Sequence, residues 1–282
     1  MLKPKTGMKN TQYAEVDGIN LRYMKVGNGE PLVLIHTLRT QLDYFQRIIP
    51  TLAGHFEIYA LDLPGHGHSD IPSGEYTSDF LTGFVEGFLL KLDLHDVTLV
   101  GESIGGVIAL SLASRGVASI KKVIALNPYD YGIGGGIRRS SLLASIVFAA
   151  IQWPVIGWLV SNSEGPVLRT IMEGGFCNKK ALPDDLVDEF RSVGSRKGYR
   201  RAERSIFGNW KSWIEAKREY EKVRVPVTLV YGDSDWSRPL EREENHRNIP
   251  GSQLITLKDT SHFPSLENPE AIINIILENS PK

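Results

Sequence analysis

Residues Val97 to Leu110 read Val-Thr-Leu-Val-Gly-Glu-Ser-Ile-Gly-Gly-Val-Ile-Ala-Leu. The first four residues are apolar or β-branched, which predicts a buried strand. A G-x-S-x-G pattern follows at residues 101–105, and apolar residues then continue at helical spacing as far as Leu112. The glycines are needed because side chains two residues either side of the serine would collide in so sharp a turn. The stretch therefore predicts an exposed Ser103 hydroxyl at a helix N-terminus, although any glycine-rich strand-to-helix turn would also fit the pattern.

The composition is that of an ordinary soluble globular chain, with 282 residues, 41% hydrophobic and 23% charged. This length suits one large core, or one core with an inserted subdomain. A net charge of −1 does not favour a nucleic-acid partner. Cys177 is the single cysteine, which excludes an internal disulfide and a cysteine-based metal cluster. This fits a cytoplasmic location, and the polar, lysine-rich residues 1–10 show no secretory signal.

Apolar runs alternate with helical patterns through much of the chain, which predicts a mostly parallel sheet with helices on both faces. Asp17-Gly18 marks a hairpin between two short strands within residues 13–26. Further strands are predicted at residues 31–35, 56–61, 97–100, 120–126, 225–231 and 253–257. Helices are predicted at residues 42–52, 77–92, 240–246 and 269–277, with a helix following Ser103.

The alternation stops between residues 130 and 220, where the patterns are helical and no convincing strand is found. We therefore expect a core of residues 1–129 and 221–282 and an inserted helical cap of residues 130–220. Residues 142–160 of this cap carry no charge. Such a run could span a bilayer, but Pro154 and Gly157 interrupt it, and two apolar helices lining an acyl pocket are the preferred interpretation. Weak contact of the cap with a membrane surface stays open as an alternative.

A serine hydroxyl needs a base within hydrogen-bond reach, and the base needs an acid to orient it. Open parallel sheets place their sites at the carboxyl ends of the strands. The strand at residues 225–231 is followed by Asp233 and Asp235, and the strand at residues 253–257 is followed by His262. The candidate set is Ser103, His262 and an aspartate, either Asp235 or Asp233, with Asp130 after an earlier strand as a third candidate acid.

These residues, their order along the chain and the segment Asp62-Leu-Pro-Gly-His-Gly-His-Ser69 resemble the α/β-hydrolase superfamily over about residues 20–280. The resemblance implies an α/β-hydrolase fold, with Ser103 as nucleophile, His262 as base and Asp235 as acid. It also implies an oxyanion hole made by the backbone amides of Ile104 and Leu38. In the family a glycine commonly follows the histidine at position 36, but Thr37 stands here.

The substrate contacts are expected from two parts of the chain. His36 and Arg39 lie close to the expected oxyanion hole, and Arg39 could bind a substrate carboxylate, an acidic neighbour or solvent. The apolar cap is expected to contribute Phe148, Trp153 and Trp158. No metal-ligand cluster and no phosphate-binding glycine loop is found, so neither a metal nor another cofactor is expected.

The sequence thus predicts a cofactor-free serine hydrolase that cleaves carboxylic esters with apolar acyl groups. A small-molecule, ester-like substrate is the expected partner, and the oligomeric state stays open. Other activities of the same triad remain alternatives, namely thioesterase, lactonase, C–C hydrolase, perhydrolase and cofactor-free oxygenase. A small-molecule receptor that keeps the pocket without turnover is the alternative from a different class.

Overall fold

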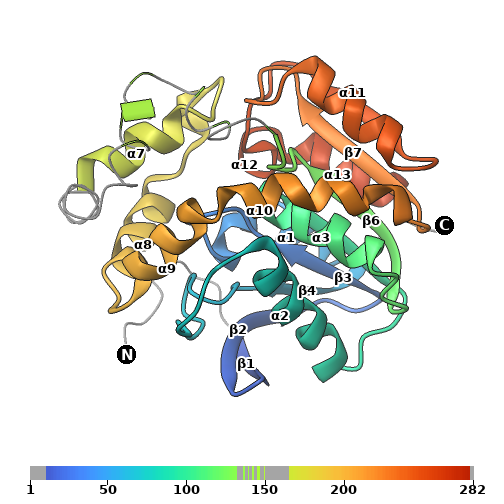
Figure 1. Cartoon of the computed structure of the whole chain (residues 1–282), viewed down its shortest axis with the longest axis horizontal. Helices are drawn as coiled ribbons and strands as arrows, with labels where there is room; N and C mark the ends of the chain where they lie inside the picture. Colours follow the sequence, from blue (N-terminus) through green and yellow to red (C-terminus); the bar gives the residue numbers. More distant parts are fainter. Residues whose placement is uncertain are drawn as a thin grey trace.

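The computed structural model describes residues 11–131 and 165–279, together with positions 136, 139, 142, 145, 146 and 149. Eight strands of these residues form one twisted sheet (Figure 1). The strands are β1 (Thr11–Val16), β2 (Ile19–Val26), β3 (Glu30–Ile35), β4 (Phe56–Leu61), β5 (Val97–Glu102), β6 (Ile120–Leu126), β7 (Val227–Gly232) and β8 (Gln253–Leu257). Their order across the sheet is β1-β2-β4-β3-β5-β6-β7-β8. β2 pairs antiparallel with β1 and β4, and the pairs from β4 to β8 are parallel, so the predicted α/β fold class is confirmed.

Helices cover both faces of the sheet, because successive side chains of a buried strand point to opposite faces. In β3, Val33 and Ile35 pack in one apolar cluster, while Leu32 and Leu34 pack in the other. The first cluster includes α2 (Ser78–Lys91), α3 (Ile104–Ser114) and the 3-10 helix η3 (Ala216–Lys222). The second includes the 3-10 helix η1 (Leu42–Phe45), α1 (Ile49–Leu52), α12 (Pro264–Glu267) and α13 (Pro269–Glu278). The remaining helix between the last two strands is α11 (Pro239–Asn248).

One predicted helix is wrong in extent. Instead of a single helix over residues 42–52, the chain forms η1, a turn and the short helix α1. Pro50 explains the break, because proline lacks the amide donor and is accepted only in the first turn of a helix. The new helix therefore begins beside it, at Ile49.

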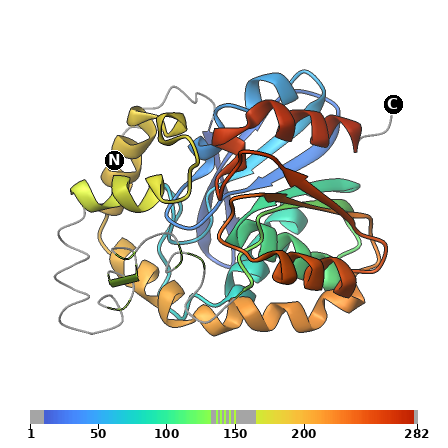
Figure 2. The same ribbon diagram turned by 90° about the horizontal axis from the view of Figure 1, so that it is seen from above.

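The described residues between β6 and β7 contain helices and no strand. They are α7 (Gly165–Glu173), η2 (Lys179–Ala181), α8 (Asp184–Gly194), α9 (Tyr199–Gly208), α10 (Trp210–Glu215) and η3. α7, α8 and α9 gather at one end of the sheet, whereas α10 runs on towards the face covered by α2 and α3 (Figures 1 and 2). The described helices are too short or too polar to cross a lipid bilayer, and most of the run 142–160 lies outside the described residues.

Candidate active site

Ser103 lies in a tight turn between β5 and α3, with φ 58° and ψ −116°. This backbone conformation is strained for a residue with a side chain. The two glycines of the motif are required by close approach. A Cβ on Gly101 would lie 2.0 Å from the carbonyl oxygen of Gly105, and a Cβ on Gly105 would lie 2.2 Å from that of Ile35. The turn thus places the serine at the carboxyl edge of the sheet.

Three side chains from different strand ends form one chain of hydrogen bonds. His262 Nε2 lies 3.0 Å from Ser103 Oγ, and His262 Nδ1 lies 2.6 Å from Asp235 Oδ1. All three residues are buried, with 2% of Ser103, 1% of His262 and 8% of Asp235 exposed. The structure therefore brings together the serine, histidine and aspartate that the sequence singles out.

Asp235 is held as a carboxylate by several donors. Its Oδ2 accepts a hydrogen bond of 2.9 Å from the Ser237 amide and a further one from the Ser237 hydroxyl. Burial alone would raise the pKa of Asp235, but the charge and hydrogen bond of His262 and the bonds from Ser237 hold it below its usual value. Asp235 is therefore ionised at neutral pH and can orient and stabilise an imidazolium.

The two alternative acids make other contacts. Asp233 is exposed, and its carboxylate accepts hydrogen bonds from the amides of Asp259 and Thr260, in the turn after β8. Asp130 is fully buried and accepts hydrogen bonds from the Tyr220 hydroxyl and the side-chain amide of Asn245, each at 3.0 Å. Neither has a described hydrogen bond to His262, so the geometry favours Asp235.

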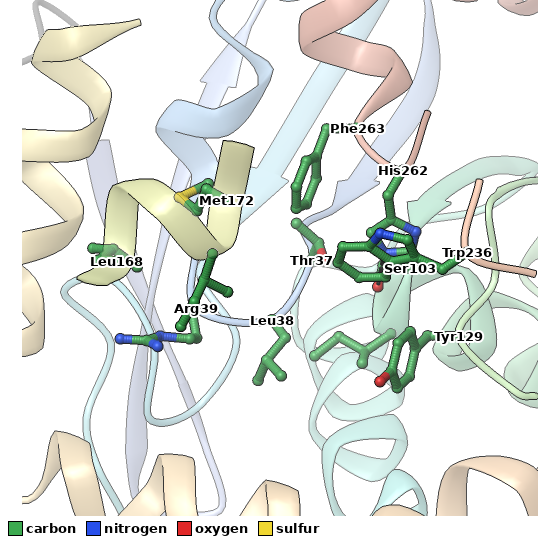
Figure 3. Close-up of a pocket in the computed structure, with 12 residues that line it drawn as sticks. Thr37, Leu38, Arg39, Ser103, Tyr129, Leu168, Met172, Trp236, His262 and Phe263 are labelled. Atoms are coloured by element: carbon green, nitrogen blue, oxygen red, sulfur yellow. Dashed lines mark hydrogen bonds between the residues drawn. The ribbon is translucent and has the colours of Figure 1, made fainter. Parts of the chain in front are cut away.

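The imidazole of His262 is enclosed by rings that sequence analysis did not identify. The Trp236 indole stacks on it, with the ring centroids 3.9 Å apart and the planes 14° from parallel. Tyr129 meets it edge-on with centroids 6.0 Å apart. Figure 3 shows Trp236 against His262, above Ser103. The one available signal for Trp236 was its position directly after Asp235.

Hydrogen bonds to backbone groups connect the loops that carry the acid and the base to neighbouring segments. The Asn127 side chain donates to the Ser261 carbonyl at 2.9 Å and accepts from the Gly232 amide at 3.0 Å. From the inserted region, the Gly175 carbonyl accepts from the His262 amide at 2.9 Å, and the Gly174 carbonyl accepts from the Trp236 indole at 3.1 Å. The inserted region thus contributes directly to the position of the base.

The loop after β3 is ordered by His36. The Leu63 amide donates to His36 Nε2, so the ring proton is on Nδ1, which donates to the Thr37 carbonyl at 2.7 Å. Burial lowers the pKa of His36 to about 4, so the ring is neutral. His36 was expected near the substrate. It is instead fully buried behind the loop and does not line the cavity that opens over Ser103.

Thr37 does not disturb this loop, because it has no positive φ. The left-handed residue is Arg39, with φ 63°. The Thr37 carbonyl also accepts from the Thr40 amide at 3.3 Å and from the Thr40 hydroxyl at 2.9 Å. Since the peptide bonds are trans, the Leu38 amide points away from this fixed carbonyl.

A cavity with about 500 Å³ of empty space opens over Ser103. Its wall is mostly apolar and is formed by Thr37, Leu38, Arg39, Ser103, Ile104, Tyr129, Leu168, Ile171, Met172, Trp236, His262 and Phe263. Leu168 and Met172 reach it from α7, opposite His262 and Trp236 (Figure 3). The three apolar side chains of α7 and those of Trp236 and Phe263 were not predicted as substrate contacts, because only the folded chain brings them to the serine.

Arg39 lines this cavity and is paired with an acidic neighbour. Its Nε lies 2.7 Å from Glu203 Oε1, and the side chains are 12% and 3% exposed. Of the three partners considered for Arg39, the structure shows the acidic one. The charge of the arginine is therefore largely neutralised where it meets the cavity.

The expected aromatic contacts are only partly described. Phe148, Trp153 and Trp158 lie outside the described residues. Phe176 is buried against Phe263, with ring centroids 5.1 Å apart. The described part of the chain holds no group of three or more metal-ligating side chains.

A buried carboxyl stands directly before the nucleophile. Glu102 is fully buried, accepts from the Tyr44 hydroxyl, and accepts from the Ser265 hydroxyl at 2.5 Å. Burial raises the pKa of Glu102 to about 8. The residue joins the turn of Ser103 to α12, which follows His262, so it links two parts of the site from behind.

Known proteins resemble the chain in sequence and in fold. The family model for the alpha/beta hydrolase fold matches residues 30–142. The uncharacterized hydrolase YugF of Bacillus subtilis is 28% identical over 265 residues, which cover 91% of this chain and 93% of that protein.

Two solved structures superpose over nearly the whole chain. Cfl2 from Burkholderia cenocepacia has a TM-score of 0.83 at 22% identity, covering 99% of this chain and 98% of that one. The enol-lactonase from Burkholderia xenovorans LB400 has a TM-score of 0.74 at 24% identity, covering 95% and 98%. Together with the sheet order and the strand-turn-helix around Ser103, these matches show that the chain has the α/β-hydrolase fold.

Proposed function

We propose that the protein is a serine hydrolase that cleaves carboxylic esters with apolar acyl groups through an acyl-enzyme, using its own side chains. The observation that carries the proposal is the unbroken chain of hydrogen bonds from Ser103 Oγ through His262 to Asp235. A serine with no base is a poor nucleophile at neutral pH, whereas this arrangement gives it a proton acceptor at 3.0 Å.

In the first half of the reaction, Ser103 Oγ attacks the ester carbonyl carbon while His262 Nε2 takes its proton. The tetrahedral intermediate then collapses, and the imidazolium gives that proton to the departing alcohol oxygen. Asp235 holds the Nδ1 proton and stabilises the imidazolium without taking the proton itself. The Trp236 ring face against the imidazole adds a favourable contact for the charged form.

In the second half, a water molecule replaces the alcohol. His262 takes a proton from the water as it attacks the acyl carbon, and returns it to Ser103 Oγ when the acid leaves. The apolar cavity wall keeps the remaining solvent away from the intermediate, which strengthens the electrostatic interactions inside the site.

The oxyanion is assigned to the amides of Ile104 and Leu38. Ile104 is the first residue of α3, where an amide has no acceptor within the helix. Three hydrogen bonds hold the Thr37 carbonyl, and these bonds turn the Leu38 amide in the opposite direction. His36 and Thr40 would in this way set the orientation of the Leu38 amide, although Thr37 stands where related loops carry a glycine. Pre-oriented donors of this kind stabilise the developing charge.

The nucleophile is tested by labelling and turnover. The wild type should react with a fluorophosphonate probe and hydrolyse p-nitrophenyl butanoate. Ser103→Ala should lose the label and about a million-fold in kcat, with an unchanged circular dichroism spectrum. If the variant, purified free of host esterases, keeps a tenth of the wild-type activity, the nucleophile is not Ser103. A wild type that neither labels nor turns over would instead indicate a receptor.

The acid is tested by three matched variants. Asp235→Asn should lower kcat by about 10⁴-fold, because the amide disturbs the tautomer of His262 and removes the stabilising charge. Asp233→Asn and Asp130→Asn should cost far less, since their described hydrogen bonds go to other groups. A larger loss from either one would reassign the acid.

Lactones and thioesters undergo the same acyl transfer and are the nearest alternative substrates. The resemblance to an enol-lactonase makes enol-lactones a necessary member of any panel. We expect kcat/KM for simple esters to exceed that for matched thioesters, lactones and C–C substrates. A lactone or a vinylogous 1,5-diketone that outperforms all esters by tenfold or more would replace the ester assignment.

A further inference from the structure

We propose that a second cavity beside the first is the acyl subsite, where the Trp213 indole donates a hydrogen bond to a neutral oxygen carried by the acyl group. This inference rests on the proposed function and specifies its substrate class: esters of oxygen-bearing, otherwise apolar acids.

The second cavity has about 270 Å³ of empty space, part of which is open to solvent, and it adjoins the first. Leu38, Ile104 and Tyr129 line both cavities. The rest of its wall comes from α9 and α10, namely Ile206, Phe207, Trp210 and Trp213. The two cavities therefore meet at Tyr129 and at Leu38 and Ile104, the two residues whose amides are assigned to the oxyanion.

The reaction decides which part of the substrate enters each cavity. The leaving oxygen must lie near His262, which returns the proton to it, and His262 lines the first cavity. The described wall of the second cavity includes neither His262 nor Ser103, but it does include Leu38 and Ile104. A carbonyl whose oxygen meets the amides of these two residues directs its acyl group, rather than its alcohol, to this side.

Trp213 supplies the polar contact. Its side chain is buried, with 2% of the residue exposed, and its Nε1 has no hydrogen-bond partner within the described chain. A buried indole N–H without an acceptor is unfavourable. An oxygen atom of the substrate would satisfy this group, and the apolar side chains of Ile206 and Phe207 would bury the carbons around it.

A neutral acceptor suits the site better than a carboxylate. Arg39 is the cation that lines the first cavity, and Glu203 lies 2.7 Å from it. Glu203 belongs to α9, the helix that also carries Ile206 and Phe207. The charge of Arg39 is thus largely neutralised by the protein itself, and a substrate carboxylate beside Arg39 would be repelled by the carboxylate of Glu203. A ketone or ether oxygen accepts from the indole without that repulsion.

The test compares p-nitrophenyl 5-oxohexanoate with its isostere 5-methylhexanoate, and 6-oxoheptanoate with 6-methylheptanoate. The members of each pair share a shape and differ in one hydrogen-bond acceptor. In at least one pair, wild-type kcat/KM should favour the keto ester by about threefold to tenfold, the value of one neutral hydrogen bond. Trp213→Phe keeps an aromatic ring but removes the donor, and the ratio should fall to about one.

Trp210→Phe is the matched control, because it makes the same chemical change in the same wall. It should alter both esters of a pair alike and keep their ratio. If the wild type does not prefer either keto ester, or if Trp213→Phe keeps the preference, the subsite is wrong while ester hydrolysis stands. If the wild type hydrolyses none of the esters, the proposed function fails.

A binding measurement judges the subsite even then. In the proton NMR spectrum of Ser103→Ala, the signal of the Trp213 indole N–H is the one that is missing in Ser103→Ala/Trp213→Phe. This signal should move downfield when a keto ester is added and should not move when its isostere is added. A signal that responds equally to both, or to neither, overturns the assignment of Trp213 as donor.

Discussion

At the scale of single residues, Glu102 shows how a carboxyl can stabilise the fold in its neutral form. Its folded pKa of about 8 lies well above the value of 4.5 expected in the unfolded chain. The folded state therefore binds the proton more tightly. The stability that comes from the neutral carboxyl is complete below about pH 4.5 and is lost as the pH rises through 8.

We therefore predict the behaviour of Glu102→Gln, in which a neutral amide replaces the acid. Between about pH 5 and pH 8, the wild type should lose up to about 1.4 kcal/mol of unfolding free energy per pH unit relative to the variant. Urea denaturation at several pH values measures this difference. Glu75→Gln, at an exposed position, should run parallel to the wild type. Parallel curves for Glu102→Gln as well would mean that Glu102 is ionised at neutral pH.

Residue types and their order along the chain predicted Ser103 and His262 with Asp235 or Asp233 as the acid, and the family resemblance favoured Asp235. Each follows a strand of the parallel part of the sheet, which brings the carboxyl ends of its strands to one edge. Trp236 and the Glu102–Ser265 contact could not be predicted in the same way. They depend on side-chain directions, which the spacing of apolar residues does not determine.

At the scale of elements, the inserted region packs tightly against the loop of His262 at Gly175. A Cβ on this residue would lie 2.4 Å from the Phe263 ring and 3.1 Å from the Trp236 ring. Both rings line the cavity, and Trp236 stacks on His262. A side chain here cannot be accommodated without moving the rings that position the base.

We expect Gly175→Ala to lower kcat/KM for p-nitrophenyl butanoate by tenfold or more. Overpacking of this kind costs about 1–3 kcal/mol of stability. Gly83→Ala is the matched control, since nothing lies within 4 Å of a Cβ at that position of α2. It should keep full activity. Full activity of Gly175→Ala at unchanged stability would show that the base loop tolerates displacement of these rings.

Some elements could be predicted well and others poorly, for a physical reason. The inner parallel strands, such as β5 and β7, are buried on both faces and stand out as apolar runs, whereas the edge strand β8 is partly exposed. The helix expected over residues 42–52 was wrong in extent because one proline outweighs an apolar pattern. The division into a core and a cap at residues 130 and 220 stays a prediction. η3 packs on α3 within the core, and Tyr220 bonds to Asp130, so the second boundary is structurally indistinct.

At the scale of the whole molecule, two buried histidines contribute to the loss of stability in acid. Burial lowers the pKa of His66 to about 3 and that of His36 to about 4, against an ordinary value of 6.5. The unfolded chain therefore takes up protons first as the pH falls. Stability from the neutral rings is complete above about pH 6.5 and is lost as the pH falls towards 3.

His66→Gln should accordingly reduce the pH dependence of stability on the acid side. As the pH falls near 5, the unfolding free energies of the wild type and the variant should both change. The wild type should lose about 1.4 kcal/mol more than the variant for each pH unit. Glu102 and Asp130, whose pKa values are raised, act in the opposite sense, and the comparison between the two proteins cancels them. His95→Gln, at an exposed position, is the control. An unchanged slope for His66→Gln would mean that His66 is protonated in the fold.

Exchange of the inserted region for that of another protein with this fold has to preserve the bonds that connect the region to the rest of the chain. Gly174 and Gly175 hold the tryptophan and histidine of the site, and Arg196 and Arg201 donate to carbonyls of the loop after β4. A graft cut at the ends of the whole insertion would discard all of these bonds. One confined to residues 140–173 would keep them. It would also keep the bonds from Arg139 to the Trp236 carbonyl and to Glu241, so it is the design in which new specificity can be introduced without rebuilding the catalytic loops.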